Sequence, residues 1–289
     1  MPIRLPFPLP LAAEIERNVA AALAEDVGAG DLTAALVPDR ADFGATVVAR
    51  EAAVLCGKDW FEHSLRRLDP DARLAWTADD GELLVPGQVL CEIRGRSRAM
   101  LTAERTCLNF LQLLSGVATR TRQFVDAVAG TGATIVDTRK TLPGLRLAQK
   151  YAVWCGGGSN HRMGLYDAIL IKENHIAAAG GIEAALAAAH RVADQAAERC
   201  HFVQIEVESL HQLELALAAG ATMLLLDNFD LPMMRQAVGY AGGRAVLEAS
   251  GNVNLDSVHA IAATGVDRIS VGALTKDIKA LDLSMRFSA

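Results

Sequence analysis

The stretch FVQIEVESLHQLELALAAGATMLLLDNF, residues 202–229, contains one complete structural repeat. Its first segment, 202–207, has the β-branched and apolar residues typical of a strand, and 210–219 has the composition of a helix. Residues 222–226 form a second apolar run that ends at a carboxylate. A strand, a helix and a further strand in this order are the unit of a parallel sheet.

The same alternation extends over the chain beyond residue 130. Further strand-like runs occupy 134–136, 168–171, 245–247 and 268–271. The segments between them are helical in composition and rich in alanine, as at 181–197 and 255–263. These residues predict helices packed closely against a barrel or an open parallel sheet.

Residues before this region have a different character. We expect a helix over 11–27, a valine- and alanine-rich segment over 43–55, a helix over 60–68 and a strand over 89–93, which together suggest a small α+β unit. A longer helical pattern over 104–128 is suited to connecting two domains.

Composition excludes several classes of protein. The chain has 289 residues, 51% of them hydrophobic and 21% charged, which is typical of a folded domain and excludes disorder. Its net charge of −6 gives no overall positive field for nucleic acid or an anionic membrane. No apolar run approaches the length of a membrane span. We therefore expect neither nucleic acid nor membrane as a partner, and any anion site must be local.

The cysteines and the N-terminus both indicate the cytoplasm. The 5 cysteines are widely spaced and odd in number, with no CxxC pair, which argues against a disulfide framework and a zinc–thiolate cluster. They are expected to fill the core. Residues 1–11 are rich in proline and are soon followed by charged residues, so we expect no signal peptide.

Polar residues follow each strand of the repeat. The apolar runs end at DTRK (137–140), KENH (172–175), EVE (206–208), DN (227–228), EASGN (248–252) and SVG (270–272). Carboxyl ends of parallel strands meet at one face of a sheet, where ligands bind in α/β proteins. Solvent exposure alone explains scattered serines, but not lysines and carboxylates directly after apolar strands.

A local excess of positive charge interrupts this acidic chain. Arg139, Lys140, Arg162 and Lys172 flank strand ends or the glycine run 156–158, and we assign them to an anion pocket. Arg146 and Lys150, four residues apart on an expected helix, are instead interpreted as a solvated face.

Two carboxylates on successive strands lie opposite this cationic group. Glu206 and Asp227 have the chemistry to hold Mg²⁺, to bind ribose hydroxyls or to stabilise an oxocarbenium-like centre, whereas Glu208 is compatible with a simple cap. His161 and His175 are candidate proton donors or anion contacts. The other five histidines are expected to be structural or solvated.

Several long motifs, in order, resemble the quinolinate phosphoribosyltransferase family. They are ERTCLN (104–109), DTRKTLPGLR (137–146), GGGSNHRMGLYD (156–167), LDNF (226–229) and SVGALT (270–275). EDVG (25–28), DLT (31–33) and the tail LDLSMRF (281–287) also resemble that family. The likeness covers essentially the whole chain.

The resemblance implies an enzyme that joins quinolinate to phosphoribosyl pyrophosphate with Mg²⁺. The products are nicotinate mononucleotide, pyrophosphate and CO2, in de novo NAD biosynthesis. It also implies a set of substrate-binding residues, Thr138 among them. Arg139, Arg162, His161 and Lys172 would bind the quinolinate carboxylates, with Arg105 from a neighbouring subunit. The phosphates would be contacted by Lys140, Lys172, Asn174, His175, Ser250, Gly251, Asn252, Ser270, Val271 and Gly272, and Glu206 and Asp227 would lie at the ribose and the metal. Lys140, Lys172, Glu206 and Asp227 would be the catalytic residues.

The implied fold is a small N-terminal α/β sandwich domain on an incomplete, seven-stranded α/β barrel. We place the first domain at 1–112 and the barrel at 113–274, with the tail 275–289 packing against the first domain. The family assembles as a homodimer with shared active sites.

Three alternatives stay open at the sequence level. One is a related phosphoribosyltransferase with another acceptor, although an acceptor with one carboxylate would not require so many arginines. The second is a Schiff-base aldolase using Lys172 or Lys140 on a barrel. The third is a non-catalytic sensor of sugar phosphates on the same scaffold.

Overall fold

The computed structural model describes residues 10–40 and 43–288, in two compact units. Unit 1 contains residues up to 122 together with 141–157 and the tail from 277, and unit 2 contains 123–140 and 158–276. This division differs from the sequence-based one, because residues 113–122 and 141–157 join unit 1. The expectation about a signal peptide concerns residues 1–9, which lie outside the described residues.

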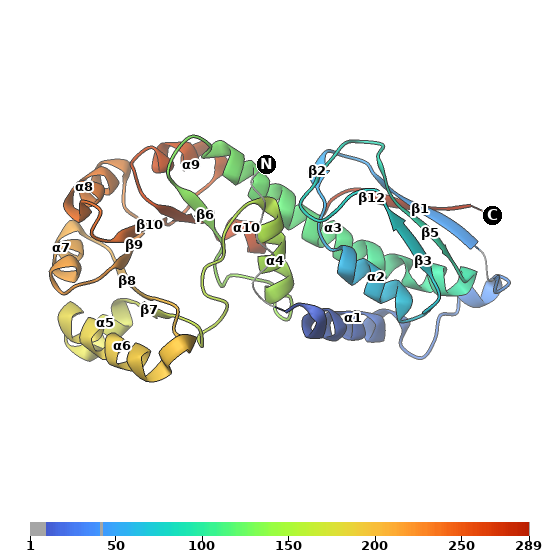
Figure 1. Ribbon diagram of the computed structural model, residues 1–289, viewed down its shortest axis with the longest axis horizontal. Helices are drawn as coiled ribbons and strands as arrows, with labels where there is room; N and C mark the ends of the chain where they lie inside the picture. The colour runs from blue at the N-terminus through green and yellow to red at the C-terminus, as the bar shows by residue number, and fades with distance from the viewer. Residues whose placement is uncertain (1–9, 41–42, 289) are drawn as a thin grey trace. The chain divides into compact units, whose positions relative to one another are not determined.

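Unit 1 is built on a four-stranded antiparallel sheet in the order β12-β1-β5-β3. Its strands are β1 (Phe43–Ala49), β3 (Arg73–Trp76), β5 (Val89–Gly95) and β12 (Leu283–Ser288), and β2 (Ala53–Val54) pairs separately with β4 (Leu83–Leu84). Its helices are α1 (Ala12–Val27), α2 (Lys58–Arg66), α4 (Arg146–Gly156) and the first part of α3 (Ser97–Ala127), with a 3-10 turn at Ala34–Leu36. The tail thus supplies an edge strand beside β1 (Figure 1).

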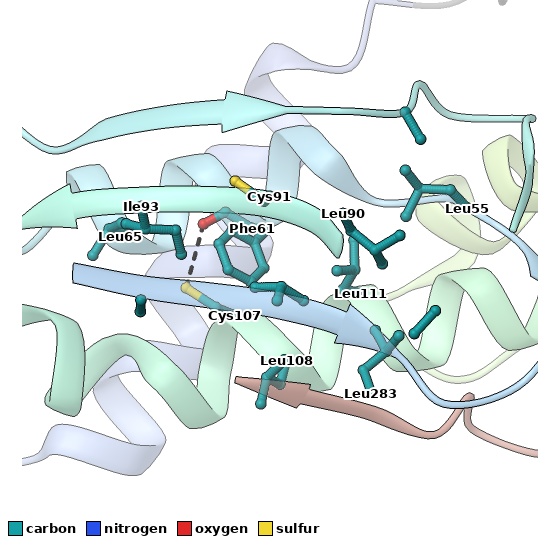
Figure 2. Packing of buried hydrophobic residues seen from close by; sticks show 14 of the residues in the cluster. Leu55, Phe61, Leu65, Leu90, Cys91, Ile93, Cys107, Leu108, Leu111 and Leu283 are labelled. Carbon is teal, nitrogen blue, oxygen red and sulfur yellow. Dashed lines mark hydrogen bonds between the residues drawn. The ribbon is translucent and has the colours of Figure 1, made fainter. Parts of the chain in front are cut away.

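The core of unit 1 lies between this sheet and its helices. Figure 2 shows Phe61 of α2, Ile93 of β5 and Leu111 of α3 meeting in it, and the Sγ atom of Cys107 lies 3.4 Å from the carbonyl oxygen of Phe61. Each of these three apolar side chains is at most 1% exposed. Burial of such side chains stabilises the unit by about 1.5–3 kcal/mol each. Cys56, Cys91, Cys107 and Cys155 are buried and free, as expected for core cysteines.

Unit 2 is a six-stranded parallel sheet in the order β6-β11-β10-β9-β8-β7. The strands are β6 (Thr134–Val136), β7 (Ile169–Ile171), β8 (Val203–Val207), β9 (Met223–Asp227), β10 (Val246–Ser250) and β11 (Arg268–Ser270). The helices are α5 (Glu173–Ala179), α6 (Ile182–Ala196), α7 (Leu210–Ala218), α8 (Leu231–Ala241), α9 (Leu255–Ala262) and α10 (Ala273–Lys276), with a 3-10 turn at Ala197–Arg199. Figure 1 shows α6 to α9 on the outside of the curved sheet.

The expected α/β barrel with a smaller N-terminal domain is confirmed, with one difference in the strand count. Ser159 forms an isolated parallel bridge with Val136 instead of a full seventh strand. Beside β6, the described chain therefore adds only this single bridge to the six-stranded sheet, at the segment that leads into His161 and Arg162.

Side-chain caps begin the barrel helices directly after the strand-end loops. Ser209 accepts a hydrogen bond from the Gln212 amide at the start of α7, and Asp230 accepts one from the Met233 amide at the start of α8. Asn254 caps α9 in the same way. These caps satisfy amides that the first turn of a helix leaves unpaired, so each loop returns promptly to its helix.

Within the described residues, the helices are too short or too polar to cross a bilayer.

Candidate active site

The strand registers bring the predicted site residues of the barrel to one end of the sheet. Glu206 of β8 is paired with Leu225, two residues before Asp227 on β9, so both carboxylates project from the same face of the sheet. Asp227 is level with Ser250 of β10. Lys172 directly follows β7, and Gly272 lies two residues after the end of β11. The site residues that the sequence predicts at separate strand ends therefore lie at one end of the sheet.

Lys172 and Glu206 form an ion pair at this end. Lys172 Nζ lies 2.8 Å from Glu206 Oε2, with the lysine side chain 45% exposed and the carboxylate side chain 9% exposed. A charged ammonium held by a carboxylate is a poor nucleophile, which favours anion binding over the Schiff-base alternative. The pair leaves Lys172 close to solvent and fixes Glu206 at the rim of the barrel.

Arg139 and Arg162 form the centre of the cationic pocket. Arg162 is buried, and one of its guanidinium nitrogens donates to the carbonyl of Ala168 over 3.2 Å. Burial and then the like charge of Arg139 lower the pKa of Arg162, against the attraction of Asp167. Among the described residues, Arg139 Nε is a buried donor without a hydrogen-bond partner. Two guanidiniums that repel each other and leave a donor unsatisfied fit an anionic ligand.

Asp137 fixes the loop that carries His161. This fully buried carboxylate accepts from Asn160 Nδ2 at 2.6 Å and from the His161 amide at 2.9 Å. The His161 ring is itself 7% exposed, and both of its nitrogens have partners inside the protein: Nδ1 accepts from the Arg162 amide, and Nε2 lies 2.8 Å from Gln204 Oε1. The ring thus connects the loop to β8.

The loops after β6 and β11 meet at Lys140. Its amide donates to Thr138 Oγ1 over 3.0 Å, and its carbonyl accepts from Thr275 Oγ1 over 2.8 Å. A Cβ added to Gly272 would lie 3.1 Å from Lys140 Cδ, so the glycine makes room for the lysine stem. Lys140 is exposed and can reach a phosphate.

The remaining predicted phosphate contacts lie on two short turns. Asn174 and His175 are exposed in the first turn of α5, where His175 Nδ1 accepts from the Lys172 amide over 3.0 Å. Gly251, after β10, has φ +110°, and a Cβ there would lie 2.3 Å from the side chain of Asn228. Only glycine fits this turn, which leads into the exposed Asn252.

Three predicted site residues are either buried or belong to the other unit. Val271 is 1% exposed and donates its amide to the Val136 carbonyl, so it holds the turn before Gly272. Ser270 is also buried, and its hydroxyl lies 3.3 Å from the Ala249 carbonyl. Arg105 is exposed on α3 within unit 1, whereas the other predicted site residues belong to unit 2.

One expectation about charge is wrong. Lys150, interpreted as part of a solvated face with Arg146, is fully buried in α4. Its neighbours Gln149, Ala152 and Val153 are buried as well, so this helix is enclosed around most of its circumference. Spacing of four residues shows that two charges share a face but not that the face meets water.

Three polar residues of the barrel interior were not assigned from the sequence. Gln204, Glu248 and Arg268 each lie two residues before a predicted site residue on the same strand, namely Glu206, Ser250 and Ser270. Because side chains alternate across a strand, these pairs share one face. The period-two recurrence of polar residues within three apolar strands was the signal that could have identified them.

Glu206 and Asp227 are the carboxylates suited to Mg²⁺ in the barrel. Both offer hard oxygen donors beside the cationic pocket, and Asn228 Nδ2 donates to Asp227 Oδ2 over 2.9 Å, which orients that carboxylate. Carboxylate oxygens are donors that Mg²⁺ prefers, so these two residues would suit such an ion. Elsewhere, in unit 1, Cys56, Asp80 and Cys155 bring potential ligand atoms within 4.8 Å of one another, but Asp80 already accepts from amides at the start of α2.

The fold and site together define an α/β-barrel protein with basic side chains and carboxylates at the carboxyl ends of its strands. The model of the C-terminal domain of quinolinate phosphoribosyl transferase matches residues 117–286, and the model of the N-terminal domain matches 31–115. The chain belongs to the quinolinate phosphoribosyltransferase family.

Individual relatives resemble the chain over nearly its whole length. A probable carboxylating nicotinate-nucleotide pyrophosphorylase of Bacillus subtilis is 41% identical, covering 90% of this chain and 89% of its own. A decarboxylating quinolinate phosphoribosyltransferase of Nicotiana tabacum is 39% identical, with 92% and 80% covered. The solved nicotinate-nucleotide pyrophosphorylase of Francisella tularensis superposes with a TM-score of 0.92 at 45% identity, covering 97% and 98%.

Proposed function

We propose that the chain transfers the phosphoribosyl group of phosphoribosyl pyrophosphate to quinolinate, with loss of one carboxylate. The products are nicotinate mononucleotide, pyrophosphate and CO2, and the reaction serves NAD biosynthesis. Family membership and the names of the relatives support this reaction. The chain's own residues support it through the charge and geometry of the pocket.

The observation that carries the proposal is the paired Arg139 and Arg162. Two like charges placed together in a partly buried site repel each other, and the lowered pKa of Arg162 reflects both burial and that repulsion. A ligand with two adjacent carboxylates would relieve this repulsion and satisfy the buried Nε of Arg139. Quinolinate carries such a pair of carboxylates, whereas nicotinate carries one.

The two carboxylates of the barrel are suited to the step at the ribose. Departure of pyrophosphate breaks the bond between the anomeric carbon and oxygen, and leaves positive charge that Glu206 and Asp227, which share a face of the sheet, would stabilise. The quinolinate nitrogen then supplies the electron pair for the new bond. Lys140 and Lys172 would offset the charge of the phosphates, and Mg²⁺, when bound with the substrate, would add to that neutralisation.

Decarboxylation requires no separate base in this scheme. Once the ring nitrogen is alkylated, its positive charge stabilises the electron pair that the departing CO2 leaves on the adjacent ring carbon, and a proton then adds to that carbon. The protein's part is to hold the two substrates in line and to limit access of water.

We also propose that the protein is a homodimer and that it is located in the cytoplasm. Arg105, exposed on α3, would complete the pocket of a partner in a homodimer. Free cysteines throughout the described chain favour a reducing compartment such as the cytoplasm.

A single assay tests the proposed reaction. The purified chain is given phosphoribosyl pyrophosphate and Mg²⁺ with quinolinate, with nicotinate or with no acceptor, and release of pyrophosphate and of CO2 is measured. We expect both products in equal amounts with quinolinate, and little of either in the other two mixtures. Pyrophosphate without CO2, or equal rates with nicotinate, would show a different acceptor, and no release at all would favour a sensor.

A further inference from the structure

A chain of buried polar side chains crosses the interior of the barrel below the anion pocket. His161 Nε2 lies 2.8 Å from Gln204 Oε1, Gln204 Nε2 lies 3.3 Å from Glu248 Oε2, and Arg268 Nε lies 3.1 Å from the same carboxylate oxygen. Gln204 and Glu248 are fully buried. Since β9 separates β8 from β10, the contact between these two residues passes over β9 on the inner face of the sheet.

The contacts of the His161 ring define its tautomer. Nδ1 accepts from the Arg162 amide over 2.8 Å, so this nitrogen carries no proton. Nε2 therefore carries the proton and donates it to Gln204 Oε1. Phe202 packs edge-on against the ring with centroids 5.3 Å apart, which restrains the ring plane. Three contacts thus fix a neutral imidazole in one orientation.

The orientation of this ring bears directly on Arg162. The imidazole accepts a hydrogen bond from the backbone amide of Arg162, and the Asp137 carboxylate accepts one from the preceding amide, that of His161. The Arg162 guanidinium donates to the Ala168 carbonyl. A buried guanidinium beside a second one has a strong tendency to turn away toward solvent. It stays in place only if its backbone and side chain are both restrained.

We propose that Gln204 and Glu248 are positioning residues for the anion pocket: they hold His161 as the Nε2–H tautomer, and His161 in turn fixes Arg162 toward the acceptor's carboxylates. Glu248 acts by holding Gln204 in the orientation that presents Oε1 to the imidazole. Without that carboxylate the Gln204 amide would be free to flip, and its NH2 group would then face the Nε2–H group of His161, so that two donors would meet. Arg268 balances the buried charge of Glu248.

The contacts of Glu248 indicate why this carboxylate is present in the barrel interior. Glu248 Oε1 is buried 3.7 Å from His161 Nε2 and has no hydrogen-bond partner among the described residues. A buried carboxylate that is only partly satisfied is destabilising by itself. Its retention in the barrel centre is understandable if it orients the amide and the ring rather than strengthening the fold.

The test uses matched substitutions at Gln204 in the full chain. Gln204→Met keeps the shape of the side chain and removes both hydrogen bonds. Gln204→Glu keeps an acceptor for the imidazole, and its second oxygen, when protonated, replaces the donor to Glu248. Thr264→Val serves as the control, because it removes a buried hydroxyl bond to the Ile261 carbonyl in the loop before β11, at the opposite end of the strands.

Two readouts separate positioning from stability. For Gln204→Met we expect the KM for quinolinate to rise about tenfold with the KM for phosphoribosyl pyrophosphate within about twofold of wild type, the scale of one lost hydrogen bond in a charged site. Gln204→Glu should recover most of the loss, and Thr264→Val should change only the melting temperature. Equal increases in both KM values, or no increase in that for quinolinate, would overturn the proposal.

The second readout is independent of the proposed reaction, on which the kinetic test rests. Imidazole ¹⁵N NMR of histidine-labelled protein, with the His161 signals assigned by their loss in His161→Gln, should show one protonated and one bare nitrogen. In Gln204→Met the Nε2–H group loses its acceptor, so the ring becomes free to rotate away from the Arg162 amide and this pattern should average. The pattern should persist in Gln204→Glu. Wild type that lacks quinolinate turnover but shows this pattern refutes the proposed function alone, whereas an averaged ring in wild type refutes the positioning chain.

Glu248→Gln covers the case in which Gln204→Met fails to fold. It keeps the length of the side chain but loses the charge that opposes Arg268. A smaller selective rise in the quinolinate KM, with partial averaging of the His161 signals, is expected. Unchanged values for both would show that Glu248 does not act on the imidazole.

Discussion

The cationic pocket shows how burial gives each charge of this chain a different role. Arg162 is enclosed beside a like charge, Lys172 is half exposed in an ion pair with Glu206, and Lys140 is exposed to solvent. A buried guanidinium is suited to specific, bidentate recognition of a carboxylate, and an exposed ammonium is suited to a mobile phosphate. We therefore expect the buried arginine to serve quinolinate and the exposed lysine to serve phosphoribosyl pyrophosphate.

Replacement of Arg162 by alanine should weaken quinolinate binding selectively. The loss of a charge-assisted contact is worth about 1.5–3 kcal/mol, while affinity for phosphoribosyl pyrophosphate should change little. Direct binding of each ligand by calorimetry measures both values. Arg191→Ala, which removes an exposed arginine of α6, is the control. Equal losses for both ligands would mean that Arg162 is assigned to the wrong substrate.

Asp227→Asn tests the electrostatic role of the second carboxylate. The amide keeps the shape of the side chain but loses the charge that favours an oxocarbenium-like transition state. Turnover should fall by about 10²–10³ while quinolinate still binds, and the dependence of rate on Mg²⁺ should change. Single-turnover rate, quinolinate affinity and melting temperature are measured on one preparation. A less stable variant with normal turnover in its folded fraction would make Asp227 a structural residue only.

At the scale of elements, stability and chemistry are placed in adjacent residues of the same loops. Asp227 ends β9 at the proposed site, and Asp230, three residues later, caps α8. Asn228 between them adopts a φ of 56° and orients Asp227 through its side chain. One short loop therefore turns the chain, orients a carboxylate and starts a helix, so its acidic residues are expected to respond differently to substitution.

Asp230→Ala should lower stability without a matching effect on catalysis. The cap accepts from the Met233 amide over 2.8 Å, and its loss typically costs about 1 kcal/mol. Chemical denaturation should show a lower free energy of unfolding with unchanged KM for both substrates. Glu214→Ala on α7, an exposed acidic residue outside any cap, should be nearly neutral. A large fall in turnover would place Asp230 in the site.

At the scale of the whole molecule, the two units each contribute to the predicted site set. The barrel unit holds the arginine pair, the carboxylates and the lysines, whereas Arg105 belongs to the unit built on the antiparallel sheet. The C-terminal tail returns to that sheet as β12. The antiparallel-sheet unit therefore contains both the first and the last described residues, and the barrel unit lies between them in the sequence. A site shared between subunits would make activity a property of the assembly.

Mixing two inactive variants tests whether sites are shared. Arg105→Ala and Lys172→Ala should each be nearly inactive but folded, since both residues are at least partly exposed. Hybrid dimers would contain one intact site if Arg105 acts across the interface, so activity should return after subunit exchange. Differently tagged chains allow the hybrids to be isolated and assayed. Inactive hybrids of verified composition would contradict the shared-site proposal.

The strands and the strand-end chemistry of this protein could be predicted from the sequence. Runs of apolar residues at 134–136, 202–207 and 222–226 correspond to β6, β8 and β9 within one or two residues. Both signals are local, because a buried parallel strand is mostly apolar and its end is where the chain turns into a polar loop. The glycine at 251 and the cap at 230 are also local requirements of single turns.

Burial of polar residues was decided only by the tertiary structure. Lys150 has the spacing of a surface residue yet is fully enclosed, and Gln204 meets Glu248 across an intervening strand although 44 residues separate them in sequence. The same curvature of the sheet brings the loop of His161 against β8. A sequence specifies which residues share a face, but contact between strands that are not neighbours depends on strand order and on the curvature of the sheet, which arise only when all six strands have assembled.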